Sequence, residues 1–381
     1  MANIGNDLLL FRKRKPWLSL ISLILISLGG LIVGQFVAVL VVIQIYDLTM
    51  FQVMEMVANI SNYPEYKVAI YILQGLSAAF AFILAPWFYL RFIEKKRIGI
   101  LNPNPGVEIL PVFLALLISV IFMAVNFKFA EWNAQMVLPD FLKEVETWMR
   151  MQEDKLEEAT IFLTSINNLQ ELILAMVVIA IIPAIGEEFL FRGLIQNQLQ
   201  SWTRNSHLAI WLTGILFSAI HIQFYGFVPR MLLGVLFGYM YFWSGNLLYP
   251  ILAHFANNGF QVLMLYLYKS EVTSFNIDDA DTVPWTVFFT SAVISVVLIL
   301  SYKRHFMKEE KDFAEWHKVF STDQMHKAEI VKAVLTDHSM NPVLINKKDS
   351  SYHNFGEIEV HVTSEFILRA RKIVEKDINF E

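Results

Sequence analysis

Long apolar runs separated by short polar segments make up most of this chain, up to about residue 302. A helix that crosses a membrane needs about 20 mostly apolar residues. Eight segments meet this pattern: 17–46, 68–93, 108–130, 169–199, 207–223, 227–244, 247–268 and 283–302. The pattern predicts an all-α polytopic membrane bundle of about eight transmembrane helices.

The pattern becomes that of a soluble domain near residue 316. Trp316–Ser321 is strand-like, and a helical apolar stripe follows from Met325 to Leu335. Val343–Ile345 and Ile358–Val362 alternate as strands before an amphipathic helix over 366–374. The order β-α-β-β-α predicts a small cytoplasmic α+β domain. The expected organisation is a membrane-embedded domain, a linker and a soluble domain: 1–302, 303–315 and 316–381.

Composition agrees with a membrane protein and excludes several classes of site. Hydrophobic residues make up 56% of the chain and charged residues 17%, whereas soluble domains carry about 25% charged residues. The net charge of -5 argues against a nucleic-acid partner. The absence of cysteine excludes disulfides, thiolate metal sites and a cysteine nucleophile.

Charges at the ends of the apolar runs predict the orientation. The first run follows Arg12, Lys13, Arg14 and Lys15 and is too long for a signal peptide, so we expect a retained anchor. The same side carries further basic residues: Arg91, Lys95, Lys96, Arg97, Arg204, Lys303 and Arg304. The opposite loops are acidic, with eight carboxylates within Glu131–Glu158 and with Asp278, Asp279 and Asp281. Basic loops stay in the cytoplasm, so both termini are predicted to be cytoplasmic.

The long acidic loop over 131–168 also carries apolar residues at helical spacing, from Leu138 to Leu156. This pattern predicts an amphipathic helix on the outer membrane face. Such a helix either packs on the bundle as a structural cover or acts as a lid over a site.

Ionisable residues inside the predicted helices are candidates for function, because charges in hydrocarbon are costly. Glu188 and Arg192 are four residues apart on the fourth helix and can pair, either as a structural bridge or as part of a site. Glu187 projects about 100° away from Glu188 and cannot share Arg192 as easily. An unpaired carboxylate of this kind suits a general base.

Polar residues on the fifth and seventh helices complete the candidate site. His221, His254 and Asn258 are weak signals singly, but a rise of about 1.5 Å per residue places all three, like Glu187, near the middle of the membrane. One polar cavity lined by these four residues explains the common depth. They suit amide hydrolysis by water, with Glu187 as base and Asn258 with His254 stabilising the oxyanion.

A metal centre is the alternative chemistry for the same residues. Glu187, His221 and His254 could bind Zn²⁺, but the sequence has no H-E-x-x-H helix and each ligand would come from a different helix. The favoured hypothesis therefore requires no cofactor.

The three motifs Glu187-Glu188-x-x-x-Arg192, Phe217-x-x-x-His221 and His254-x-x-x-Asn258 resemble those of the CAAX protease and bacteriocin-processing (Abi) family. The resemblance implies a glutamate-dependent intramembrane endopeptidase, historically labelled a metalloprotease, with an eight-helix core. It implies that Glu187 is the base, supported by Glu188 and Arg192, and that His221 orients water. It also implies that His254 and Asn258 form the oxyanion site.

The tail resembles a putative prokaryotic signal-transducing protein domain over Asn346–Gly356. Together the two resemblances imply a bacterial inner-membrane protein. Its expected partners are the lipid bilayer, a membrane-associated peptide or protein substrate, and a protein or ligand that binds the tail. A non-enzymatic receptor or scaffold that binds a peptide in the same cavity is the alternative function. A transporter is disfavoured because the sequence shows no repeated halves.

Overall fold

The computed structural model describes residues 15–274, 283–314, 316–347 and 357–378. Contacts divide the chain into two units, Met1–Lys303 and Arg304–Glu381. The first is helical and the second mixes helices and strands. Part of the predicted orientation depends on residues that lie outside the described ones: Arg12, Lys13, Arg14, Asp278, Asp279 and Asp281.

The predicted membrane bundle is confirmed, and a helix occurs at each of the eight expected positions. Two of these helices contain π-helical turns. The first three are α2 (Pro16–Tyr46), the composite of α4 (Lys67–Ala79), η3 (Phe80–Leu84), α5 (Ala85–Phe88) and η4 (Tyr89–Ile93), and α6 (Ile109–Ala134). The fourth comprises α8 (Leu169–Ala175), η7 (Met176–Ile181), α9 (Ile182–Glu188), η8 (Phe189–Gln196) and α10 (Asn197–Thr203). The others are α11 (Ser206–Ala219), α12 (Phe227–Ser244), α13 (Leu248–Lys269) and α14 (Trp285–Ala314).

Five helices of the described chain are long and apolar enough to cross a membrane: Pro16–Tyr46, Pro64–Ile93, Ile109–Ala134, Leu169–Thr203 and Trp285–Met307. The helix Ser206–Ala219 is apolar but shorter. Large apolar side chains point outward along α2 and α14, as on Ile32, Phe36 and Val293. An exposed apolar surface of this extent is typical of helices that face lipid. The chain is therefore a multi-pass membrane protein.

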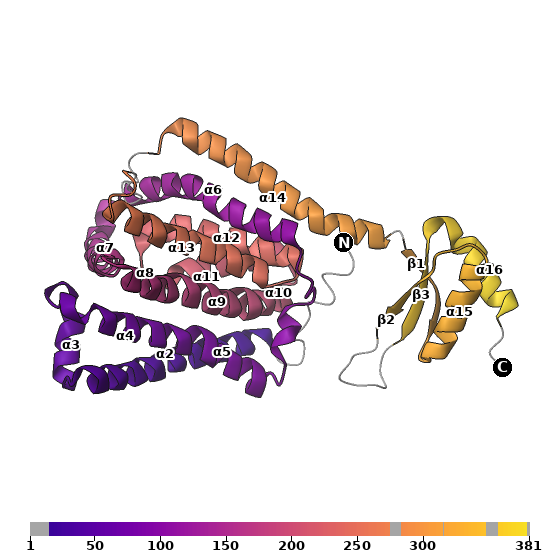
Figure 1. The fold of residues 1–381 in the computed structure, drawn as a ribbon, viewed down its shortest axis with the longest axis horizontal. Helices are drawn as coiled ribbons and strands as arrows, with labels where there is room; N and C mark the ends of the chain where they lie inside the picture. The colour runs from indigo at the N-terminus through magenta and orange to yellow at the C-terminus, as the bar shows by residue number, and fades with distance from the viewer. Residues whose placement is uncertain (1–14, 275–282, 315, 348–356, 379–381) are drawn as a thin grey trace. The chain divides into compact units, whose positions relative to one another are not determined.

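The bundle helices run side by side in Figure 1, with α2 on α4, α6 on α13, and α11 on α12. Buried apolar residues from these helices form two clusters, one around Phe191 and Leu194 and the other around Val178 and Leu73. Both clusters include residues of the composite fourth helix. This helix therefore lies inside the bundle, which explains why polar residues on it can be kept from lipid.

The fifth helix was predicted to reach residue 223, and this boundary was wrong. The helix α11 ends at Ala219, and Ile222 adopts a left-handed backbone conformation with φ of 54°. A residue in this conformation cannot continue a right-handed helix. His221 therefore lies in the turn that follows α11, where its N–H bonds to the carbonyl oxygen of Ser218 at 3.3 Å.

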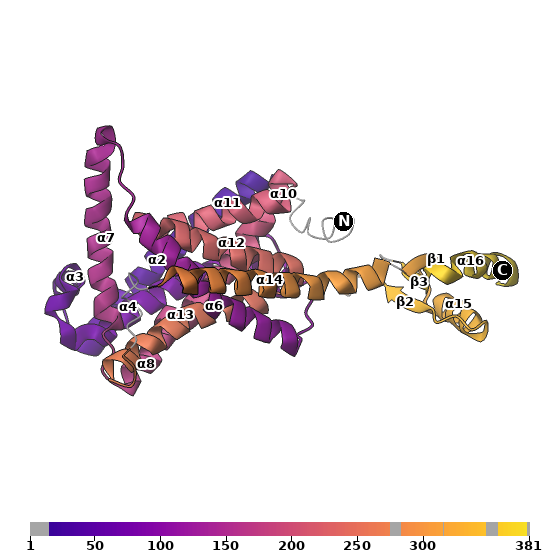
Figure 2. The same cartoon turned by 90° about the horizontal axis from the view of Figure 1, so that it is seen from above.

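The acidic loop contains the predicted amphipathic helix, α7 (Lys143–Thr164). A separate short helix, α3 (Met50–Ala58), follows α2. Figure 2 shows α7 running across one end of the bundle helices. Its side chains contact the turn between α11 and α12. The rings of Trp148 and Phe224 lie 5.4 Å apart, the guanidinium of Arg150 lies 4.5 Å from the ring of Tyr225, and Glu153 accepts a hydrogen bond from Tyr225 N–H.

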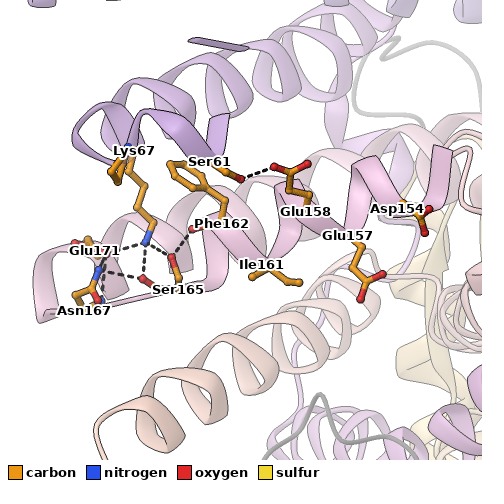
Figure 3. A pocket seen from close by; sticks show the side chains of 11 residues that line it. Ser61, Lys67, Asp154, Glu157, Glu158, Ile161, Phe162, Ser165, Asn167 and Glu171 are labelled. Atoms are coloured by element: carbon orange, nitrogen blue, oxygen red, sulfur yellow. Dashed lines mark hydrogen bonds and ion pairs between the residues drawn. The ribbon is translucent and has the colours of Figure 1, made fainter. Parts of the chain in front are cut away.

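A buried lysine fastens the C-terminal end of α7 to the bundle. Figure 3 shows Lys67 of α4 between Glu171 and Ser165, with Nζ 2.9 Å from the Glu171 carboxylate and 2.6 Å from the Ser165 carbonyl oxygen. On the preceding turn of the chain, Ser61 donates to Glu158 of α7 at 2.5 Å. Lys67 thus holds both sides of the 164–169 connection to α4, and Ser61 holds α7 to the turn over Ile60–Asn62.

The second unit confirms the predicted β-α-β-β-α order. Its elements are β1 (Trp316–Thr322), α15 (Met325–Asp337), β2 (Val343–Asn346), β3 (Ile358–Thr363) and α16 (Ile367–Asp377). The sheet order is β1-β3-β2 with antiparallel pairs. Alternate residues of β3, Ile358, Val360 and Val362, pack with the helices into one core. Most of the segment with the signal-transducing resemblance, 348–356, lies outside the described residues.

A cluster of charges stabilises β3 on the other face of the sheet. The Glu359 carboxylate lies 2.8 Å from Lys347 Nζ, 2.9 Å from His361 Nε2 and 3.4 Å from Lys318 Nζ. Burial alone raises the pKa of this carboxyl, but the hydrogen bonds from Lys347 and His361 and the nearby lysine charges outweigh burial and lower the pKa to about 2.

Glu359→Gln is expected to destabilise the second unit in a pH-dependent way. The folded pKa lies below the ordinary value of 4.5, so the carboxylate stabilises the fold above pH 4.5 and loses this effect as the pH falls toward 2. Amide exchange of β3 in the full-length protein should be about 10-fold faster in the variant near pH 6, and this difference should shrink near pH 3. The exposed Glu329→Gln is the matched control. An equal difference at both pH values would contradict the assignment.

Candidate active site

The composite fourth helix positions two adjacent glutamates inside the bundle. Glu187 and Glu188 end α9, a seven-residue α-helical segment between the π-helical segments η7 and η8. Insertions of this kind in α-helices occur frequently at functional sites. Glu187 is 8% exposed and Glu188 is fully buried.

Glu188 and Arg192 form a fully buried ion pair, as their spacing predicts. Arg192 Nη1 donates to Glu188 Oε1 at 2.7 Å, and Nη2 donates to the carbonyl oxygen of Gly234 on α12 at 2.8 Å. The guanidinium also lies over the rings of Phe217 and Phe237, at 4.8 and 5.5 Å from their centroids. The pair therefore connects the fourth helix to α11 and α12 as well as neutralising Glu188.

Glycines on α11 and α12 allow these two helices to pack closely. A Cβ atom at Gly234 would lie 3.0 Å from the Cα of Gly214 on α11, and a Cβ at Gly214 would lie 2.8 Å from Val235. Small residues at a helix crossing permit such close backbone approach in membranes.

His254 of α13 joins the two glutamates. Its Nδ1 lies 2.7 Å from Glu188 Oε1, and its Nε2 lies 4.0 Å from Glu187 Oε2. A carboxylate only accepts hydrogen bonds, so Nδ1 carries a proton and Nε2 faces Glu187. Phe237 stacks on the imidazole, with ring centroids 5.3 Å apart. Glu188 therefore fixes both the orientation and the tautomer of this histidine.

Asn258 is held one turn further along α13. Its Nδ2 donates to the carbonyl oxygen of Ile179 at 3.0 Å and lies 3.3 Å from His254 Nε2. Ile179 stands four residues before Pro183, which has no N–H to donate to that carbonyl. Asn257 donates in turn to Asn258 Oδ1 at 3.0 Å. The proline of the fourth helix and the asparagine of α13 thus position each other.

His221 reaches the same cavity from the turn after α11. Its Nδ1 lies 2.8 Å from the carbonyl oxygen of Phe217. Because a carbonyl oxygen only accepts, Nδ1 is the protonated nitrogen and Nε2 of the neutral ring is left as a hydrogen-bond acceptor. The ring also contacts that of Phe217 edge-on, at 5.2 Å.

The four predicted residues line one cavity of about 470 Å³, a volume typical of small-ligand sites. Glu187, His221, His254 and Asn258 contribute to its wall, while Glu188 and Arg192 lie behind them. Polar residues that the sequence analysis did not select also line it: Gln74, Asn126, Arg230, Asn257 and Gln261. Arg230 could have been selected as a candidate from the sequence, because it is a lone charge within an apolar run.

The same cavity contains the three residues expected to bind zinc, the alternative cofactor. No group of three His, Asp or Glu side chains among the described residues could hold a metal ion. Glu187, His221 and His254 share the cavity, and Nδ1 of each histidine is hydrogen-bonded, to the Phe217 carbonyl oxygen and to the Glu188 carboxylate respectively. A histidine that binds a metal through Nε2 commonly has such a partner at Nδ1. Zinc therefore stays an alternative for these three residues.

Arg192→Leu is expected to destabilise the helical unit by about 3–5 kcal/mol, because it leaves Glu188 buried without its cation. Glu188→Leu/Arg192→Leu should recover most of this loss, since both charges are then removed. Thermal unfolding in detergent measures both, with the exposed Arg97→Gln as control. A single variant as stable as the unmodified protein would contradict the pairing.

Comparison with known proteins identifies the segment that carries the site. Residues 169–260 match the family model described as type II CAAX prenyl endopeptidase Rce1-like. The uncharacterized protein YpbD of Bacillus subtilis (strain 168) is 31% identical over 84 residues, which cover 21% of this chain and 40% of YpbD. The chain thus spans about two fifths of the length of that relative. No solved structure matches.

The matched segment begins at α8 and ends on α13, so it contains all three motifs and the helices that hold them. The family predicted from those motifs is therefore confirmed, whereas the resemblance of the tail stays a prediction. Residues 169–260 of this multi-pass membrane protein are thus similar to the type II CAAX prenyl endopeptidase Rce1-like family.

Proposed function

We propose that this chain is an intramembrane endopeptidase in which Glu187 activates water to hydrolyse a peptide bond of a membrane-associated protein or peptide. The observation that supports this most directly is the shared cavity. Its wall brings Glu187 together with two histidines and an asparagine from the turn after α11 and from α13.

Before the first step, a water molecule donates one hydrogen bond to the Glu187 carboxylate and a second to Nε2 of His221. Nε2 accepts because Nδ1 is bonded to Phe217. Glu187 takes the proton while the water oxygen bonds to the carbonyl carbon of the substrate. This role for Glu187 is supported by its position, since Arg192 is already engaged with Glu188 and Gly234.

The charge that develops on the carbonyl oxygen is stabilised by Asn258 and His254. Their side-chain nitrogens, Nδ2 and Nε2, lie 3.3 Å apart and can face one oxygen atom. Because Nδ1 of His254 donates to Glu188, the ring can donate to the oxyanion from Nε2 only when both nitrogens carry a proton. The Glu188 carboxylate, 2.7 Å from Nδ1, would stabilise that form of the ring.

In the second step, the carbon–nitrogen bond breaks and Glu187 returns the proton to the leaving amine nitrogen. The products are a carboxylic acid and an amine, and Glu187 is again ionised. Each group then has the protonation state in which it started.

The same proposal includes the place and partners of the protein. Basic residues such as Arg91, Arg97 and Arg204 support cytoplasmic termini in a bacterial inner membrane. The domain over 316–381 then faces the cytoplasm, where it can bind a protein or ligand partner. The substrate reaches the cavity from the bilayer.

Glu187→Gln is expected to lower kcat by at least about 100-fold, because a general base is lost while the side chain keeps its size. The measurement is cleavage of a peptide library by the purified protein in detergent, with and without a strong chelator. Folding and membrane insertion should be unchanged. The exposed Glu157→Gln on α7 is the matched control and should retain activity.

Three results would alter the proposal. Unchanged activity of Glu187→Gln would remove this residue as the base. Loss of activity to the chelator would favour zinc bound by Glu187, His221 and His254. Peptide binding without cleavage by the unmodified protein would favour a receptor or scaffold.

A further inference from the structure

A second charged group lines the cavity and has no part in the hydrolysis described above. Arg230 lies in the first turns of α12, and its side chain borders the same space as Glu187. The residue is half-buried. A charge in such surroundings is costly unless an opposite charge compensates it.

The partners of Arg230 in the described chain are neutral. Its Nη1 donates to the main-chain carbonyl oxygen of Gln223 at 3.4 Å, and its Nη2 donates to the Gln223 side-chain oxygen. The carboxylates whose charges act on it are Glu153 of α7 and Glu187 of α9, and neither forms an ion pair with it. Arg192, in contrast, has the Glu188 carboxylate at 2.7 Å.

The backbone at Gly226 fits closely around the guanidinium. A Cβ atom at this position would lie 2.5 Å from Nη1 of Arg230. The two hydrogen bonds to Gln223 and this close contact hold the planar group at the cavity wall. A fixed guanidinium can bind a carboxylate through two parallel hydrogen bonds.

We propose that Arg230 determines substrate specificity by binding a carboxylate of the peptide while its scissile bond lies at Glu187. This inference rests on the proposed peptidase function. The anion has two chemical sources, the C-terminal carboxylate of the peptide or an acidic side chain near the scissile bond. Both supply the charge that the described protein partners of Arg230 do not.

The test measures binding rather than cleavage, so that it is separate from the test of peptidase activity. The protein is the full chain with Glu187→Gln, and the probes are four fluorescent apolar hexapeptides of otherwise identical sequence. One ends in a free carboxylate and one in an amide. The other two end in an amide and carry one internal Glu or Gln.

A carboxylate-containing probe should bind about 10- to 100-fold more tightly than its neutral counterpart, as expected for a charge-assisted hydrogen bond. In Arg230→Gln this ratio should fall to about 1, with little change for the neutral probes. The pair of probes that shows the preference identifies the source of the carboxylate. Arg97→Gln, an exposed arginine outside the cavity, should keep the ratio.

Gly226→Ala is the second variant, because it retains the positive charge but forces the guanidinium to move. It should also reduce the ratio. The proposal is overturned if no probe pair shows a preference, or if Arg230→Gln weakens charged and neutral probes equally, as a purely structural role at the Gln223 turn predicts. If the unmodified protein cleaves no peptide but the binding ratio is retained, the peptidase function is rejected and the carboxylate site is kept.

Discussion

The Glu188 side chain is fully buried, and the two hydrogen bonds that its Oε1 accepts fix the rest of the site. One donor is Arg192, which continues to the Gly234 carbonyl oxygen and so ties the fourth helix to α12. The other is His254, which brings in α13. An apolar bundle tolerates ions only where they are paired inside it, and here the pairing also orients a histidine toward Glu187.

The proline of the fourth helix contributes a second constraint. Pro183 cannot donate to the Ile179 carbonyl oxygen, and Asn258 donates to it instead. In membranes, carbonyl groups near a proline must find donors within the protein. This need places an amide beside His254, next to the space in which the proposed oxyanion forms.

Much of this architecture could be predicted from the sequence, because it depends on local patterns. Apolar runs gave the helix positions, and the spacing of Glu188 and Arg192 indicated a pair on one helix face. The contact of Arg192 with Gly234 could not be predicted, since it depends on how the fourth helix packs against α12. The π-helical turns and the early end of α11 at Ala219 likewise have no clear signal in local composition.

The place of Arg230 in the cavity depends on packing between helices, although its charge alone would have justified selecting it. The alternative with zinc was open at the level of residue types, since histidines and a glutamate are suitable ligands. The structure leaves this alternative open, because it fixes only one nitrogen of each ring. Glu188 and Phe217 each hold one ring nitrogen of the two histidines.

Direct attack by water is the central claim, and single-turnover cleavage in ¹⁸O-labelled water tests it most directly. The products and the protein would then be analysed by mass spectrometry. If Glu187 acts as a base, the label appears in the new carboxyl group of the peptide and Glu187 remains unlabelled. Label in the Glu187 carboxyl group would reveal a covalent intermediate and contradict the account.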